Sequence, residues 1–315
     1  MAKRFDELDF LKGIMIMLMV AFHLVYIGDG YPYVKQIVYT FHIPVFFIIS
    51  GYLMNVEKPF WGYVRSLLWL LVPYLIMESG YILMASVLPI REHIDGLTPV
   101  VFVNKLFLTP IGPYWYLHSL ILCSVVYYIC FIKSRYKDIL VARMVLSSAV
   151  LGFISLYWGI ISLSSIFYFL VGVTVRQSSV NFFSFFRKSW IAVLGFVVLV
   201  QFPTNLDRFT IGGVLVVYLV ISSLLAIYAV LPHFICSVIN YIGRHTLVIL
   251  LFSPLFTVVV KPLVDVFAFD QTRLLFLFTA LCINVCGCFL IGVIMDYCGI
   301  TPYFFGKNKI MESIK

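Results

Sequence analysis

Ionisable side chains inside long apolar segments are the residues of this sequence that could do chemistry. His23, His42, Glu78 and His118 each interrupt such a segment. An ionisable side chain in the bilayer costs at least about 2.5–3.5 kcal/mol, which makes each of them a candidate for a functional role. A neutral imidazole accepts a proton near neutral pH. His23, in an otherwise apolar segment, is therefore the candidate for proton transfer.

Lys12 lies eleven residues before His23 in the same segment. In a helix this spacing corresponds to about 16 Å along the axis and about 20° of rotation. The two side chains are expected on one stripe, with the cation at one membrane face and the imidazole near the other. Lys12 on its own could also be an interfacial anchor whose ammonium snorkels to water.

The composition requires that these residues be carried by membrane helices. Of the 315 residues, 63% are hydrophobic and 11% charged, and the mean hydropathy is +1.05. Soluble domains are about 45–50% apolar and about 25% charged, so secreted, cytosolic and disordered classes are excluded. The seven cysteines have no zinc-like or disulfide spacing, and no metal site is predicted.

Scanning for stretches of about 20 apolar residues predicts an all-α integral membrane protein. We expect one polytopic domain over 1–315 without a separate soluble domain, and a bundle of about ten transmembrane helices. The expected spans are 10–27, 37–54, 66–88, 114–132, 140–158, 161–175, 189–202, 211–231, 245–260 and 274–295.

The distribution of basic residues predicts cytoplasmic N- and C-termini. With ten spans, sixteen of the 22 Lys and Arg residues fall on the inner side, as the positive-inside rule requires. This explains the net charge of +8 without nucleic acid as a partner. The inner residues are Lys3, Arg4, Lys12, Lys58, Arg65, Lys133, Arg135, Lys137, Arg143, Arg176, Arg187, Lys188, Arg244, Lys307, Lys309 and Lys315; the outer ones are Lys35, Arg91, Lys105, Arg208, Lys261 and Arg273.

In this topology His23, His42, Glu78 and His118 all fall in the outer half of the membrane. Because consecutive spans usually pack together, they could line one water-accessible pocket. The alternative is four separate interfacial residues, with Glu78 stabilising the bundle through a hydrogen bond to Tyr or Ser.

Two stretches resemble the start of the membrane-bound acyltransferase-3 family, in particular its sugar O-acetyltransferase branch. They are LDFLKGIMIMLMVAFH from Leu8 to His23 and YTFHIPVFFIISGYL from Tyr39 to Leu53. The family's basic residue before a proline in the third span is matched by Arg65 and Pro73, and PYWYLHSL at 113–120 is similar to its tryptophan-containing motif. Lys12 stands where Arg is common, and Ser253 stands near the position of a late histidine.

The resemblance implies transfer of an acetyl or other acyl group from acetyl-CoA to a carbohydrate hydroxyl. Members have about ten membrane helices, and the implied location is a bacterial-type inner membrane. His23 would be the general base, oriented by Glu78 or His42, while Lys12 and Arg65 would hold the donor's phosphates at the inner face.

The matched motifs also give Ser50, Trp115 and His118 as candidate contacts of the acceptor, which would be a carbohydrate or a lipid-linked glycan. The thioester arm would reach through the bundle, so that the acceptor is acylated towards the outside. Direct attack by the hydroxyl and a relay through an acyl-histidine both fit these residues.

Two other classes of function fit the composition. A transporter or flippase of a glycan or lipid-linked intermediate would also place polar groups at membrane depth, although no inverted repeat is visible. A non-catalytic anchor or receptor would not need Lys12, His23, His42 and Glu78 there.

Overall fold

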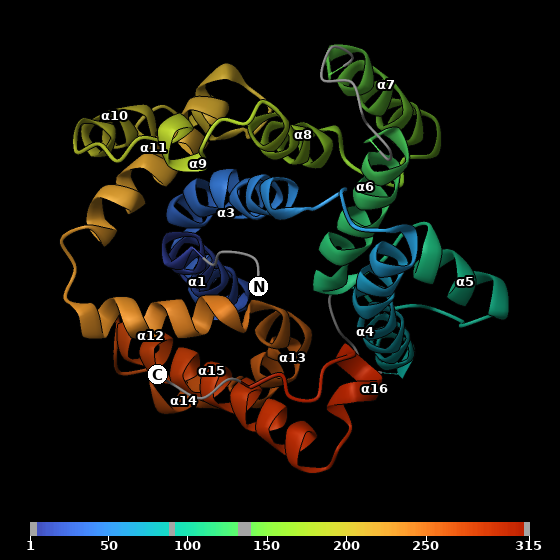
Figure 1. Ribbon diagram of the computed structural model, residues 1–315. Coiled ribbons are helices and arrows are strands. Elements are labelled where there is room, and N and C mark those ends of the chain that lie inside the picture. Colours follow the sequence, from blue (N-terminus) through green and yellow to red (C-terminus); the bar gives the residue numbers. More distant parts are fainter. Residues whose placement is uncertain (1–4, 88–91, 132–139, 312–315) are drawn as a thin grey trace.

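The computed structural model describes residues 5–87, 92–131 and 140–311, and these residues form helices without any strand (Figure 1). The all-α prediction is therefore confirmed. Lys3, Arg4, Arg91, Lys133, Arg135, Lys137 and Lys315, which entered the charge distribution, lie outside the described residues. The helices are α1 (Asp6–His23), α2 (Val25–Gly30), α3 (Pro32–Leu53), α4 (Phe60–Val87), α5 (Pro99–Phe107), η1 (Gly112–Tyr114), α6 (Trp115–Phe131), α7 (Leu140–Phe153), η3 (Ile154–Trp158), α8 (Leu163–Gln177), α9 (Phe182–Phe185), α10 (Ile191–Leu199), η4 (Pro203–Leu206), α11 (Ile211–Tyr228), α12 (His233–Arg244), α13 (Thr246–Val259), α14 (Leu263–Val266), α15 (Leu274–Tyr297) and α16 (Thr301–Phe305).

Six helical stretches in the described part of the chain are long and apolar enough to cross a membrane: α3, α4, η1 with α6, α7 with η3, α11 and α15. The pair α12 and α13, bent by 80° at its break, brings the number to seven if it counts as one span. The protein is thus a multi-pass membrane protein.

Three of the ten expected spans fall on helices outside this set. The segment 10–27 corresponds to α1, which begins with three acidic residues in its first turn, followed by α2. The segments 161–175 and 189–202 correspond to α8, with 15 residues, and α10, with 9 residues. The count of ten spans and the cytoplasmic termini stay predictions.

Helices α1 and α3 lie side by side at the centre of the bundle (Figure 1). Helix α1 packs against α12, α13, α11 and α15, whereas α3 packs against α8 and α11. Helices α4, α5 and α6 form a group to one side. The central helices are mostly buried, while most of the apolar surface of α4, α7 and α15 faces outward, as expected for lipid contact.

Glycines bring the central helices into direct backbone contact with their partners. A Cβ on Gly51 of α3 would lie 2.2 Å from the carbonyl oxygen of Phe169, and one on Gly172 of α8 would lie 2.0 Å from that of Ile48. Helices α1 and α12 meet in the same way at Gly13 and Gly243. Small residues at such crossings are a common means of packing helices in membranes, where lipid removes the hydrophobic driving force between them.

Candidate functional site

His23 and His42 both lie close to Tyr39. His23 is the last residue of α1 and is exposed, while His42 lies in α3 and is buried. The centre of the Tyr39 ring is 6.1 Å from that of His23 and 5.1 Å from that of His42. The hydroxyl of Tyr39 donates to the carbonyl oxygen of Phe22, 3.2 Å away, which fixes the ring against the end of α1. Two of the residues expected in a shared pocket are therefore close together.

Both imidazoles are oriented by the carbonyl groups of their own helices. Nδ1 of His23 donates to the oxygen of Met19 at 2.7 Å, and Nδ1 of His42 donates to that of Val38 at 2.8 Å. A carbonyl only accepts, so Nδ1 carries the hydrogen in each ring. In the neutral ring Nε2 is then the basic atom, which is the form that a general base requires.

An open pocket of about 430 Å³ lies beside this group, with Tyr39 as one of its lining residues. One wall is a single face of α3, and the other is the end of η4 with the loop that follows it. The lining residues are Pro32, Lys35, Gln36, Tyr39, Leu206, Asp207 and Arg208. This volume lies in the range of small-ligand pockets, about 300–1,000 Å³.

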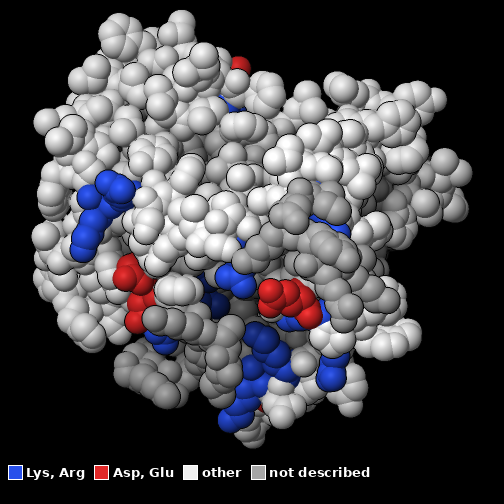
Figure 2. Space-filling model, turned by 45° about the horizontal axis from the view of Figure 1, so that its top comes forward, with Lys and Arg blue, Asp and Glu red and all other residues white. Residues whose placement is uncertain are grey.

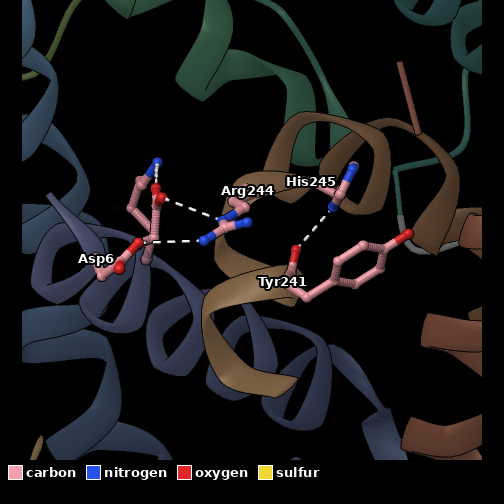
Figure 3. A network of polar contacts seen from close by, with 6 residues as sticks. Asp6, Tyr241, Arg244 and His245 are labelled. Atoms are coloured by element: carbon pink, nitrogen blue, oxygen red, sulfur yellow. Dashed lines mark hydrogen bonds and ion pairs between the residues drawn. The ribbon is translucent and has the colours of Figure 1, made fainter. Parts of the chain in front are cut away.

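Lys12 belongs to an ionic network at the opposite end of α1 (Figure 3). Its Nζ lies 2.6 Å from one carboxylate oxygen of buried Asp9, and Nε of Arg244 lies 3.7 Å from the other. Arg244 also donates to Asp6 at 3.1 Å. Lys12 and His23 both lie on α1, as expected. The two cations and two carboxylates of the network sum to zero charge, so the cationic end of this helix is neutralised.

The network lies where α12 ends and α13 begins. Arg244 is the last residue of α12, and buried His245 stands at the 80° break between the two helices. Nδ1 of His245 donates to the carbonyl oxygen of Tyr241 at 2.7 Å, and its ring packs on that of Tyr241 (Figure 3). The start of the ninth expected span thus lies against the start of the first.

Figure 2 shows one face of the molecule on which Lys and Arg gather together with a few acidic side chains, while most of the face is white. Such a restricted charged region is expected at the aqueous end of a membrane bundle.

Glu78 and His118 hold a different part of the chain. An oxygen of Glu78 accepts from the backbone N–H of Ile111 at 2.7 Å, and Nε2 of His118 donates to the carbonyl oxygen of Phe107 at 2.8 Å. Tyr74, one turn before Glu78, donates to Leu106 at 2.6 Å. The structure thus places Glu78 and His118 against the end of α5 and the segment that leads to η1, while His23 and His42 are beside Tyr39.

The other candidates are placed on separate elements. Ser50 lies 3.0 Å, hydroxyl to hydroxyl, from Tyr116 and so joins α3 to α6. Trp115 is the first residue of α6 and is half-buried. Arg65 is exposed on α4. Within residues 5–87, 92–131 and 140–311, no group of three or more His, Cys, Asp or Glu side chains is placed to hold a metal ion.

The sequence analysis missed Tyr39, Asp9, Lys35 and Arg208 as members of these groups. Spacing could have indicated two of them, because Tyr39 precedes His42 by three residues and Asp9 precedes Lys12 by three, which places each pair on one helix face. The approach of Arg208 to Lys35 depends on the path of the loop after η4 and has no local signal.

Comparison with known families finds a match that covers most of the chain. A family model described as an acyltransferase domain matches residues 5–293, which is nearly the whole chain. No curated protein and no solved structure matches the chain. The match includes α1, α3 and the pocket beside Tyr39, as well as the ionic network at Asp9. This membrane protein belongs to the acyltransferase-3 family.

Proposed function

We propose that the protein transfers an acetyl group from acetyl-CoA to a hydroxyl of a carbohydrate or lipid-linked glycan, with His23 as the general base. The observation that carries this proposal is the hydrogen bond from Nδ1 of His23 to Met19, which leaves Nε2 as the basic atom beside the pocket at Tyr39. Family membership supports acyl transfer, and it does not favour a transporter or flippase.

In the proposed reaction Nε2 of His23 takes the proton of the acceptor hydroxyl while the hydroxyl oxygen attacks the thioester carbonyl. The tetrahedral intermediate collapses with cleavage of the carbon–sulfur bond. The proton on His23 passes to the departing CoA thiolate, and an ester and free CoA result. His42 and Tyr39 keep the imidazole of His23 in place as positioning residues. Glu78 does not take this role, because its carboxylate accepts a hydrogen bond from the backbone N–H of Ile111.

The donor is proposed to enter at the other end of α1. Lys12 and Arg244 lie there with their carboxylate partners, and Arg65 is exposed on α4. Binding of the CoA phosphates would draw the cations from Asp6 and Asp9, since phosphate is a strong acceptor for Arg and Lys. We propose that this end is cytoplasmic and that the acceptor is acylated on the other side.

The test is acetyl transfer from radiolabelled acetyl-CoA by purified protein in liposomes, with His23→Ala and His23→Gln variants. A general base contributes about 10²–10⁴-fold to the rate, so we expect a loss of that size in turnover with acetyl-CoA binding retained. His233→Ala is the matched control because His233 is an exposed histidine at the start of α12. Full turnover by both His23 variants would contradict the proposal.

The direction of transfer has its own measurement. Sealed inside-out and right-side-out vesicles are given labelled acetyl-CoA externally, and transfer is expected only when the cytoplasmic face is outward. Transfer only in right-side-out vesicles would overturn the direction. Mass analysis of rapidly quenched protein tests whether His23 carries the acetyl group between the two substrates.

A further inference from the structure

The open pocket beside Tyr39 has a charged lining that suits a particular class of acceptor. Two cationic side chains, Lys35 and Arg208, come from different walls, and Gln36 adds an amide. Asp207 is the one acidic residue among the lining residues described, and its carboxylate already accepts from the backbone N–H of Phe209 at 2.9 Å. The lining therefore carries a net positive charge of one.

One hydrogen bond joins the two walls directly, and two others tie the walls to neighbouring helices. The hydroxyl of Thr40 donates to the carbonyl oxygen of Leu206 at 2.8 Å, and that of Tyr168 donates to the carbonyl oxygen of Arg208 at 2.5 Å. Tyr33, on the first turn of α3, donates to Val200 at 2.5 Å. A pocket whose walls are fixed in this way needs little rearrangement on binding, which preserves affinity.

The aromatic ring in the lining gives the pocket its second property. Pro32, Lys35, Gln36 and Tyr39 are spaced so that they occupy one face of α3. Nζ of Lys35 lies 5.7 Å from the centre of the Tyr39 ring, and the ring of His23 lies 6.1 Å away, centre to centre. A polyhydroxylated ring bound beside Tyr39 would have the Lys35 ammonium and the proposed general base nearby.

We infer that this pocket binds the acceptor, and that the acceptor is a sugar carrying an anionic group, either a carboxylate or a phosphate. The inference rests on the proposed function and specifies its acceptor. Lys35 and Arg208 pair with the anionic group, Arg208 as a planar fork and Lys35 as a point charge. The sugar ring lies on Tyr39, and a hydroxyl reaches Nε2 of His23.

The experiment measures equilibrium binding of three probes to the full-length protein in detergent, without acetyl-CoA. The probes are glucuronate, glucose 1-phosphate and glucose, which differ in the anionic group. We expect at least one anionic probe to bind about tenfold or more tightly than glucose, because hydrogen bonds to charged groups are worth about 1.5–3 kcal/mol each. Preference for glucuronate indicates an acidic sugar, and preference for glucose 1-phosphate indicates a phosphorylated or lipid-linked one.

The variant Lys35→Gln/Arg208→Gln is expected to reduce binding of the anionic probe to the level of glucose. Lys35→Arg/Arg208→Lys keeps both charges and separates loss of charge from loss of folding. Lys261→Gln removes an exposed cation just after α13, outside the pocket, and is expected to bind as the wild type does.

Equal binding of all three probes by the wild type would overturn the inference, as would unchanged binding by the doubly neutral variant. The proposed function is tested separately by supplying acetyl-CoA. Charge-selective binding without transfer to any acceptor would leave the pocket in place and remove the acyltransferase reaction with carbohydrate. Transfer without charge-selective binding would leave the acyltransferase reaction in place and remove the inferred anionic acceptor.

Discussion

Replacing Gly172 by alanine tests whether direct backbone contact between α8 and α3 holds the pocket in position. The added Cβ would lie 2.0 Å from the carbonyl oxygen of Ile48 and 2.9 Å from the backbone nitrogen of Tyr52, both of which are backbone atoms that cannot rotate away. Since Cβ contacts shorter than 3.0 Å essentially never occur, the two helices must separate by about 1 Å there.

The expected cost follows from that displacement. Overpacking a close contact costs about 1–3 kcal/mol, while the better helix propensity of alanine returns up to about 1 kcal/mol. We expect Gly172→Ala to lower the free energy of unfolding by about 1–2 kcal/mol. Because α3 carries Tyr39 and His42, a shift of about 1 Å is also expected to reduce acetyl transfer by up to about 100-fold.

The assay is reversible unfolding in mixed micelles with increasing SDS, combined with turnover in liposomes. Gly152→Ala is the matched control, because Gly152 lies in α7 and a Cβ there meets nothing within 4 Å. That variant is expected to be as stable as the wild type or up to about 1 kcal/mol more stable. Wild-type stability of Gly172→Ala, or an equal loss in Gly152→Ala, would refute the reasoning.

Substitutions at two further positions, Asp9 and Glu78, examine the polar groups away from the pocket. Asp9→Asn removes the buried partner of Lys12 and Arg244 and is expected to destabilise the protein by about 1–2 kcal/mol. This is less than the cost of breaking a fully buried pair, because Lys12 is partly exposed. Unchanged unfolding in SDS would contradict this expectation. Glu78→Gln keeps an oxygen that can accept from Ile111, so stability and turnover are expected within about twofold of wild type. Glu78→Ala is expected to lower the free energy of unfolding by about 2–3 kcal/mol. A large loss of turnover in Glu78→Gln with normal stability would show that Glu78 acts in catalysis.

The helical architecture was predictable because long apolar segments leave a membrane chain few alternatives. Each of the ten expected spans overlaps a helix of the structure. The packing of α1 on α3 brings His23 near Tyr39, which is also beside His42. The start of α1 was placed four residues late, because Asp6, Glu7 and Asp9 are not apolar, although acidic residues are favourable in the first turn of a helix.

It was less predictable which candidate side chains lie together, because this depends on contacts between segments that are distant in the sequence. Glu78 and His118 were expected at the depth of pocket residues, but their hydrogen bonds go to backbone groups at the end of α5 and in the segment that follows it. Nothing local in the sequence indicates the route of that segment. Likewise Asp9 meets Arg244 across more than two hundred positions of sequence, through the packing of α1 on α12.

The glycine contacts at Gly13 and Gly243 also bear on how substrates enter and leave. A Cβ on Gly243 would lie 1.7 Å from the carbonyl oxygen of Asp9, so no side chain separates α1 from α12, and α3 meets α8 in the same manner. Two helices whose main chains touch in this way can slide or separate only if the whole interface between them is lost. The rearrangements of a catalytic cycle are therefore expected in α4, α5 and α6, which form a group to one side of the central pair and are joined by side-chain hydrogen bonds from α4 and α6 to the end of α5 and the residues that follow it.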